Sequence, residues 1–105
     1  MPRVDVVALV DDLMDRSRLA QAAPAVRFVK TADEAAGADI VVVDLARHGD
    51  AIAALRAQSV TARIVGFGPH VDEDVADRAR RDGANAVLPR SRFFRDPTAA
   101  LAGDV

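Results

Sequence analysis

Short apolar runs alternate along this chain with longer segments in which apolar residues recur at helical spacing. The runs are nearly continuous and rich in β-branched residues, which is typical of strands buried on both faces of a sheet. We expect five strands, at residues 4–10, 26–29, 40–43, 63–67 and 86–88.

The segments between these runs predict helices. We expect them at residues 13–23, in one or two turns after Thr31, from about residue 51, at residues 72–82 and within residues 93–102. On a helical wheel, four apolar residues of the first helix fall within about 120° of one another: Leu13, Leu19, Ala20 and Ala23. The inner stripe of the fourth helix is predicted at Val71, Val75 and Ala79.

Five strand–helix units in series predict an α/β fold. Such units form a parallel sheet with right-handed crossovers and helices on both faces. We therefore expect a flavodoxin-like, doubly wound, five-stranded sheet of order 2-1-3-4-5 in three αβα layers. At 105 residues, the chain has room for one domain over residues 1–105.

Composition narrows the function classes. The chain has no cysteine, which excludes disulfides and thiolate metal sites and fits a cytoplasmic protein. No apolar run approaches the roughly 20 residues of a membrane span, and acids stand where a signal peptide needs a cleavage site. A net charge of −2 and only four aromatic residues argue against nucleic-acid binding.

Three acidic residues follow two of the predicted strands. Asp11 and Asp12 follow the first strand, and Asp44 follows the third. In a 2-1-3-4-5 sheet these strands are neighbours, and ligands bind beyond the carboxyl ends of such strands. Clustered carboxylates repel one another unless a cation neutralises them, and Mg²⁺ prefers oxygen ligands. The alternative is that Asp12 only caps a helix and Asp44 only ends a strand.

Three segments together resemble response-regulator receiver domains. They are Leu9-Val10-Asp11-Asp12, Asp39-Ile40-Val41-Val42-Val43-Asp44-Leu45 and Asp82-Gly83-Ala84-Asn85-Ala86-Val87-Leu88. The resemblance spans nearly the whole chain and rests on the order and placement of the motifs. It implies that Asp44 is the phosphoacceptor and that Asp11, Asp12 and Asp44 bind Mg²⁺.

The sequence departs from the family at the positions that act after phosphorylation. The family's serine or threonine at the end of the fourth strand falls on Gly68, and its lysine after the fifth strand falls on Arg90. The family's aromatic switch residue falls on Val87, and the chain's only lysine, Lys30, lies at the end of the second strand. These departures indicate an atypical receiver, in which phosphorylation is not required for output.

Weaker signals lie on the same side of the predicted sheet. The glycines of residues 66–70 could bind an anion, although they fit a tight turn or close packing better. His48 and His70 could join a metal site or accept a phosphoryl group, or simply be solvated. Arg90 could pair with Asp44 through two hydrogen bonds, or be exposed.

The leading interpretation is a stand-alone receiver-like signalling module that is not an enzyme. It would bind another signalling protein, such as a histidine kinase or an output protein, and homodimer formation is left open. One alternative is a phospho-accepting receiver with slow Mg²⁺-dependent phosphotransfer. The other is a flavodoxin-like domain that binds a small anion or a nucleotide.

Overall fold

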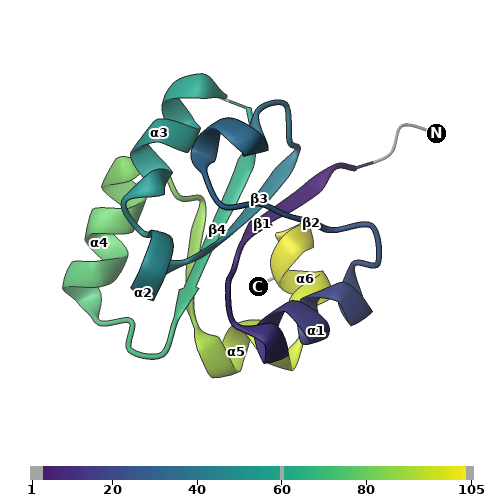
Figure 1. Cartoon of the computed structure of the whole chain (residues 1–105). Coiled ribbons are helices and arrows are strands. Elements are labelled where there is room, and N and C mark those ends of the chain that lie inside the picture. The colour runs from purple at the N-terminus through teal and green to yellow at the C-terminus, as the bar shows by residue number, and fades with distance from the viewer. Residues whose placement is uncertain (1–3, 60, 104–105) are drawn as a thin grey trace.

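Five parallel strands form one sheet in the order β2-β1-β3-β4-β5 (Figure 1). The computed structural model describes residues 4–59 and 61–103. The strands are β1 (Val6–Leu9), β2 (Arg27–Phe28), β3 (Ile40–Asp44), β4 (Arg63–Gly68) and β5 (Ala86–Pro89). The predicted fold class and strand order are confirmed.

Helices cover both faces of the sheet. Figure 1 shows α2, α3 and α4 on one side and α1, α5 and α6 on the other. The elements are α1 (Leu13–Ala22), the 3₁₀ turn η1 (Ala32–Ala35), α2 (Leu45–His48), α3 (Ala51–Gln58), α4 (Glu73–Asp82), α5 (Arg90–Arg95) and α6 (Pro97–Ala102). Within the described residues, no helix is long and apolar enough to cross a membrane.

Side chains alternate along each strand, so the sheet supports two separate cores. Val41 and Ile64 face α3 and α4 and pack in one cluster with Ile52 of α3. Val42 and Val65 face the other way, into a cluster with Leu19 of α1, Phe93 of α5 and Leu101 of α6. The strands are therefore apolar on both faces, which is why they read as continuous apolar runs.

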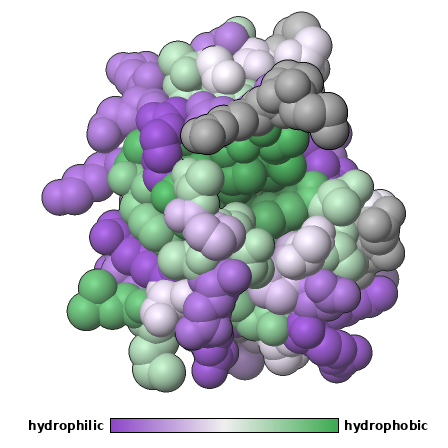
Figure 2. All heavy atoms as spheres, turned by 90° about the vertical axis from the view of Figure 1, so that its right-hand side faces the viewer, coloured by the Kyte–Doolittle hydropathy of each residue, from purple (hydrophilic) through white to green (hydrophobic). Residues whose placement is uncertain are grey.

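The second cluster extends toward the β2 edge of the sheet. Val26 and Phe28 pack against it and are only partly buried. Figure 2 shows the molecule from the right-hand side of Figure 1, and on this face apolar residues gather around a hollow between hydrophilic ones. The rest of the visible surface is mostly hydrophilic.

Several predicted boundaries move. β1 is shorter than residues 4–10, and β2 has only two residues. The last predicted helix is in fact two, because Asp96 precedes a proline and adopts an extended conformation, which ends α5. The Asp96 side chain then accepts a hydrogen bond from the Ala99 N–H and caps α6, with Pro97 as its first residue.

Two predicted inner faces are partly wrong. Leu13 is 79% exposed, because it begins α1 at the margin of the buried arc, whereas Asp15 and Leu19 point into the protein. In α4 the buried residues are Ala76 and Ala79, and Val75 is half-exposed. A wide apolar arc on a helical wheel has two margins, and only packing decides which of them is covered.

Candidate functional site

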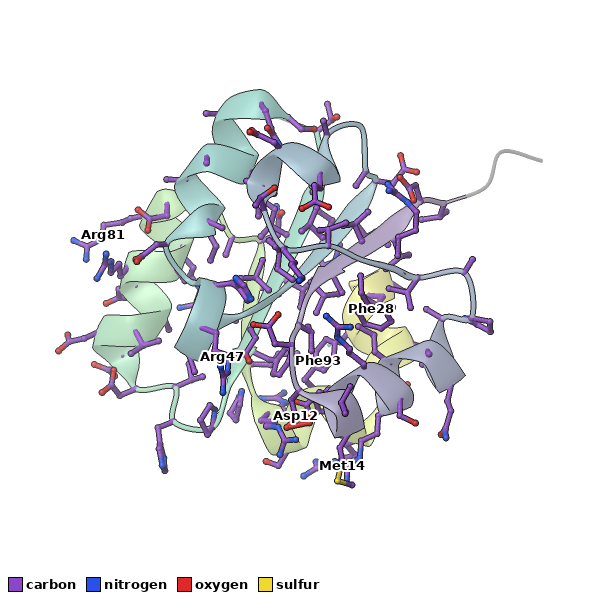
Figure 3. The ribbon with its side chains drawn as sticks, viewed as in Figure 1. Asp12, Met14, Phe28, Arg47, Arg81 and Phe93 are labelled. Carbon is purple, nitrogen blue, oxygen red and sulfur yellow. The ribbon has the colours of Figure 1, made fainter. Side chains whose placement is uncertain are left out.

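An open acidic cavity lies at the carboxyl ends of β1 and β3. Its volume is about 410 Å³. It is lined by Asp11, Asp12, Asp15, Asp44, Ala46, Arg47, Phe67, Pro69 and Arg90. Figure 3 shows two of these residues, Asp12 and Arg47, near one end of the sheet, with Met14 beyond them on α1. The three acids singled out in the sequence therefore line one cavity.

Asp12 also serves as the N-cap of α1. Its Oδ1 accepts hydrogen bonds from the Met14 N–H at 2.8 Å and from the Asp15 N–H at 3.1 Å. These two bonds favour the charged form, so they lower the pKa of Asp12. The capping role considered as the alternative for Asp12 is thus real, and it leaves the second carboxylate oxygen at the cavity.

Asp44 is the most enclosed of the three. It is 8% exposed, ends β3 and caps α2 by accepting a hydrogen bond from the Ala46 N–H at 3.1 Å. Burial raises the pKa of Asp44, the Ala46 bond opposes that rise, and the nearby Asp15 carboxylate adds to it. The structure therefore disfavours the charged form of Asp44 when no cation is bound.

Asp11 is paired with a histidine of α2. Nε2 of His48, at the end of α2, lies 3.0 Å from Oδ2 of Asp11. This contact links the segment after β1 to the helix that follows β3. His70 is exposed and is not among the described residues that line the cavity.

Arg90 pairs with Asp15 instead of Asp44. Its Nε donates to Asp15 Oδ2 at 3.2 Å, and its Nη2 donates to Asp15 Oδ1, which gives a two-bond ion pair. The hypothesis of a forked Arg90–Asp44 pair is therefore wrong. Asp15 is 3% exposed, and a carboxylate so deeply buried requires a cationic partner, which only Arg90 supplies within the described residues.

Asp15 and Arg47 line the cavity but were not predicted from the sequence. Asp15 lies in the first turn of α1, where acids are common, so its residue type there gives no sign of a site. A signal was available, because Asp15 lies four residues before Leu19 and so shares its buried face. Arg47 carried no comparable signal, since it is an exposed residue of a four-residue helix.

The two glycines of β4 differ in how closely their neighbours pack. A Cβ on Gly66 would lie 2.8 Å from Cδ2 of Leu45, so Gly66 provides room for that side chain. Gly68 ends β4 with no side chain, and a Cβ there would meet Leu45 and Val71 at 3.6 Å. Val87 is buried in the core on the α3–α4 side. The close-packing interpretation is supported for Gly66, whereas the space around Gly68 would accept a Cβ.

The donor set suits a hard divalent cation. Asp11, Asp12 and Asp44 offer carboxylate oxygens, which Mg²⁺ prefers, and Mg²⁺ keeps several waters and needs only one or two carboxylates directly. In residues 4–59 and 61–103, no three acidic or histidine side chains are gathered tightly enough to hold one ion directly. Asp11, Asp12 and Asp44 as the metal ligands, and Asp44 as a phosphoacceptor, stay predictions.

Comparison with known proteins identifies the fold. No protein-family model matches the chain, and no curated protein matches its sequence. A response regulator from Burkholderia pseudomallei, described with a phosphorylated aspartic acid, a calcium ion and citrate, matches with a TM-score of 0.79 and 23% identity. The match covers 94% of this chain and 66% of that protein.

Two further solved structures match over nearly their whole length. The signal receiver domain of a protein described as the response regulator NarL from Mycobacterium tuberculosis has a TM-score of 0.80 at 17% identity, covering 99% of this chain and 97% of that one. A response regulator from Hahella chejuensis has a TM-score of 0.79 at 19% identity, covering 95% and 93%. The chain therefore has the receiver fold, a flavodoxin-like parallel sheet of order 2-1-3-4-5, and is similar in structure to response-regulator receiver domains.

Proposed function

We propose that this chain is a receiver-like signalling module that acts by binding another protein and does not catalyse a reaction on a substrate. The observation that carries the proposal is the position of Asp44, buried at the end of β3 in a cavity shared with Asp11 and Asp12. The structural similarity to response-regulator receiver domains supports a signalling role and a protein partner, either a histidine kinase or an output protein.

The proposal includes a Mg²⁺ ion in the acidic cavity. Asp11, Asp12 and Asp44 would hold it, and the ion would neutralise carboxylates that otherwise repel one another. The burial of Asp44 in a cavity shared with Asp11 and Asp12 supports this role, because a cation beside a buried carboxylate stabilises its charged form. The residues that would contact the ion come from the ends of two adjacent strands.

The module is proposed to work without a phosphorylation-driven switch. Gly68 has no hydroxyl to contact a phosphoryl group, and Val87 is an aliphatic residue fixed in the core. Neither position carries a polar or aromatic side chain that could move between two conformations when Asp44 is phosphorylated. A ligand shifts an equilibrium only through different interactions with its two states, so a phosphoryl group on Asp44 would change the output surface little.

A Mg²⁺ titration followed by amide NMR tests the cavity. We expect shifts near Asp11 and Asp44 in the native protein, and weaker binding after Asp11→Asn. Asp50→Asn is the matched control, because the Asp50 side chain is 97% exposed and lies outside the cavity. No Mg²⁺-dependent shifts, or equal binding by Asp11→Asn and the native protein, would rule out the metal site.

Incubation with a small phosphodonor, followed by mass spectrometry, separates the proposal from its alternative. A phosphoryl mass gain that is lost in Asp44→Asn would identify a phospho-accepting receiver. We expect little or no gain, since the module is proposed to signal by binding. Binding of a nucleotide at the acidic cavity in the same NMR assay would instead favour the flavodoxin-like alternative.

A further inference from the structure

Four carboxylates and two guanidinium groups line the acidic cavity, and their pairing is selective. Arg90 has three acids within its electrostatic reach, namely Asp15, Asp12 and Asp44. It forms both of its side-chain hydrogen bonds with Asp15. Within the described part of the chain, Asp44 accepts only the Ala46 N–H bond and has no cationic partner.

The position of the Arg90 guanidinium is fixed from two sides. Asp15, in the first turn of α1, accepts through both carboxylate oxygens, which restricts the planar group to one orientation. The ring of Phe94, in α5, lies under the guanidinium, with Cζ of Arg90 5.7 Å from the ring centroid. The cation is thereby held by contacts with α1 and α5.

We propose that Asp15 is a positioning residue that holds Arg90 away from Asp44 and so keeps Asp44 available to a divalent cation. For an arginine released from Asp15, Asp44 is the one other buried carboxylate among the described residues. The arginine would then occupy the place of the metal ion, because both compete for the same oxygens. The effect on cation binding rests on the proposed Mg²⁺ site. The Arg90–Asp15 ion pair does not depend on a metal ion.

The first test is Mg²⁺ affinity by titration calorimetry in four proteins: native, Asp15→Asn, Arg90→Gln and the double variant. Arg90→Gln should raise Mg²⁺ affinity in both the native and the Asp15→Asn protein, because it removes a positive charge that repels the ion. In the Asp15→Asn background it should raise affinity by a further three- to fivefold or so, because there it also removes a competing ion pair. Equal effects of Arg90→Gln in the two backgrounds would overturn the proposal.

Arg47 provides the matched control. It lines the same cavity and carries the same charge, yet no hydrogen bond joins it to Asp15 among the described residues. Arg47→Gln should therefore change Mg²⁺ affinity by the same factor with and without Asp15→Asn. A background-dependent effect of Arg47→Gln would show that Asp15 acts on the whole cavity, which also contradicts the proposal.

A second test needs no metal, so it applies even if the protein binds no Mg²⁺. Failure to bind Mg²⁺ would contradict the proposed function but not the role of Asp15. In the native background, Asp44→Asn should not lower the melting temperature. In the Asp15→Asn background, Asp44→Asn should lower it by roughly 4 °C or more, because Arg90 has moved onto Asp44. The same response in both backgrounds would overturn the proposal.

Should Asp15→Asn not fold, Arg90→Lys replaces it as the test background, since lysine keeps the charge and loses the forked pair.

Discussion

Leu45 packs directly on Gly66, whose added Cβ would lie 2.8 Å from Leu45 Cδ2 and 3.1 Å from its Cγ. Leu45 is the first residue of α2 and directly follows Asp44. The contact therefore seats the helix that Asp44 caps on the middle of β4. A glycine in the interior of a strand, which normally weakens it, here fixes the position of the residue beside Asp44.

The first prediction concerns this contact. Gly66→Ala should destabilise the protein by about 1–3 kcal/mol, because the methyl group forces Leu45 to move in a packed core. Gly68→Ala is the control, since its Cβ would meet neighbours at an ordinary 3.6 Å. It should change stability by less than about 0.5 kcal/mol, as unstrained substitutions do. Urea unfolding measures both, and equal losses would show that Leu45 adapts freely.

The second prediction concerns Asp44 in the absence of metal. Burial raises the pKa of Asp44 in the folded protein, so folding favours its protonated form. Its favourable contribution is complete below the ordinary pKa of an aspartate and is lost as pH rises through the raised value. Asp44→Asn should therefore stabilise the fold at neutral pH, and the gain should vanish in acid.

Thermal melts of the native protein and of Asp44→Asn at several pH values measure the difference in stability between them. A chelator keeps both proteins free of metal ions. The Ala46 hydrogen bond can be kept by the asparagine oxygen, which makes the substitution a clean test of charge. Added Mg²⁺ should reverse the order, because only the native carboxylate binds it. A marked loss of stability in metal-free Asp44→Asn at neutral pH would contradict the burial argument.

The third prediction concerns the buried ion pair. Arg90→Met leaves Asp15 buried without its partner and should cost about 1–3 kcal/mol. The lower part of that range is expected, because the Arg90 side chain is 38% exposed and water can approach. The double variant Asp15→Leu with Arg90→Met should recover most of the loss, since apolar residues can replace a buried pair. A double variant no more stable than Arg90→Met would refute this.

The fourth prediction concerns transmission of a phosphoryl signal. Beryllofluoride with Mg²⁺ should shift amide resonances near Asp11, Asp44, Gly68 and Arg90 only. The coupling to α4 should be under about 1 kcal/mol, the lower end of allosteric coupling, because Gly68 and Val87 cannot relay a movement. Large shifts reaching Ala79 and the rest of α4 would reveal a switch at other residues.

The strands were predictable because burial on both faces leaves a continuous apolar signal. The predicted third strand, residues 40–43, matches β3 (Ile40–Asp44) almost residue for residue. The predicted first strand began too early, because Val4 is apolar but exposed. The helix faces were less certain. Val75 and Ala76 are consecutive and lie about 100° apart on the wheel, and contacts with the sheet, which the sequence does not contain, decide which one is covered.

The acids of the cavity were predictable for a related reason. Residues that follow adjacent parallel strands must meet at one edge, so strand order alone brings Asp11 and Asp44 into one cavity. The partner of Arg90 was not predictable in this way. Asp15 and Arg90 are 75 residues apart, and their pairing depends on how α1 and α5 lie on the sheet, which strand order does not specify.

Both edges of the sheet offer very little backbone to another chain. The β2 edge consists of two residues, Arg27–Phe28, and Arg27 is held by Asp5 at 2.8 Å. The opposite edge, β5, ends at Pro89, which has no N–H to donate. Exposed strand edges are the usual starting point for intermolecular β-pairing. Over residues 4–59 and 61–103, a chain that is half hydrophobic thus presents no long edge strand on which a misfolded or neighbouring copy could extend the sheet.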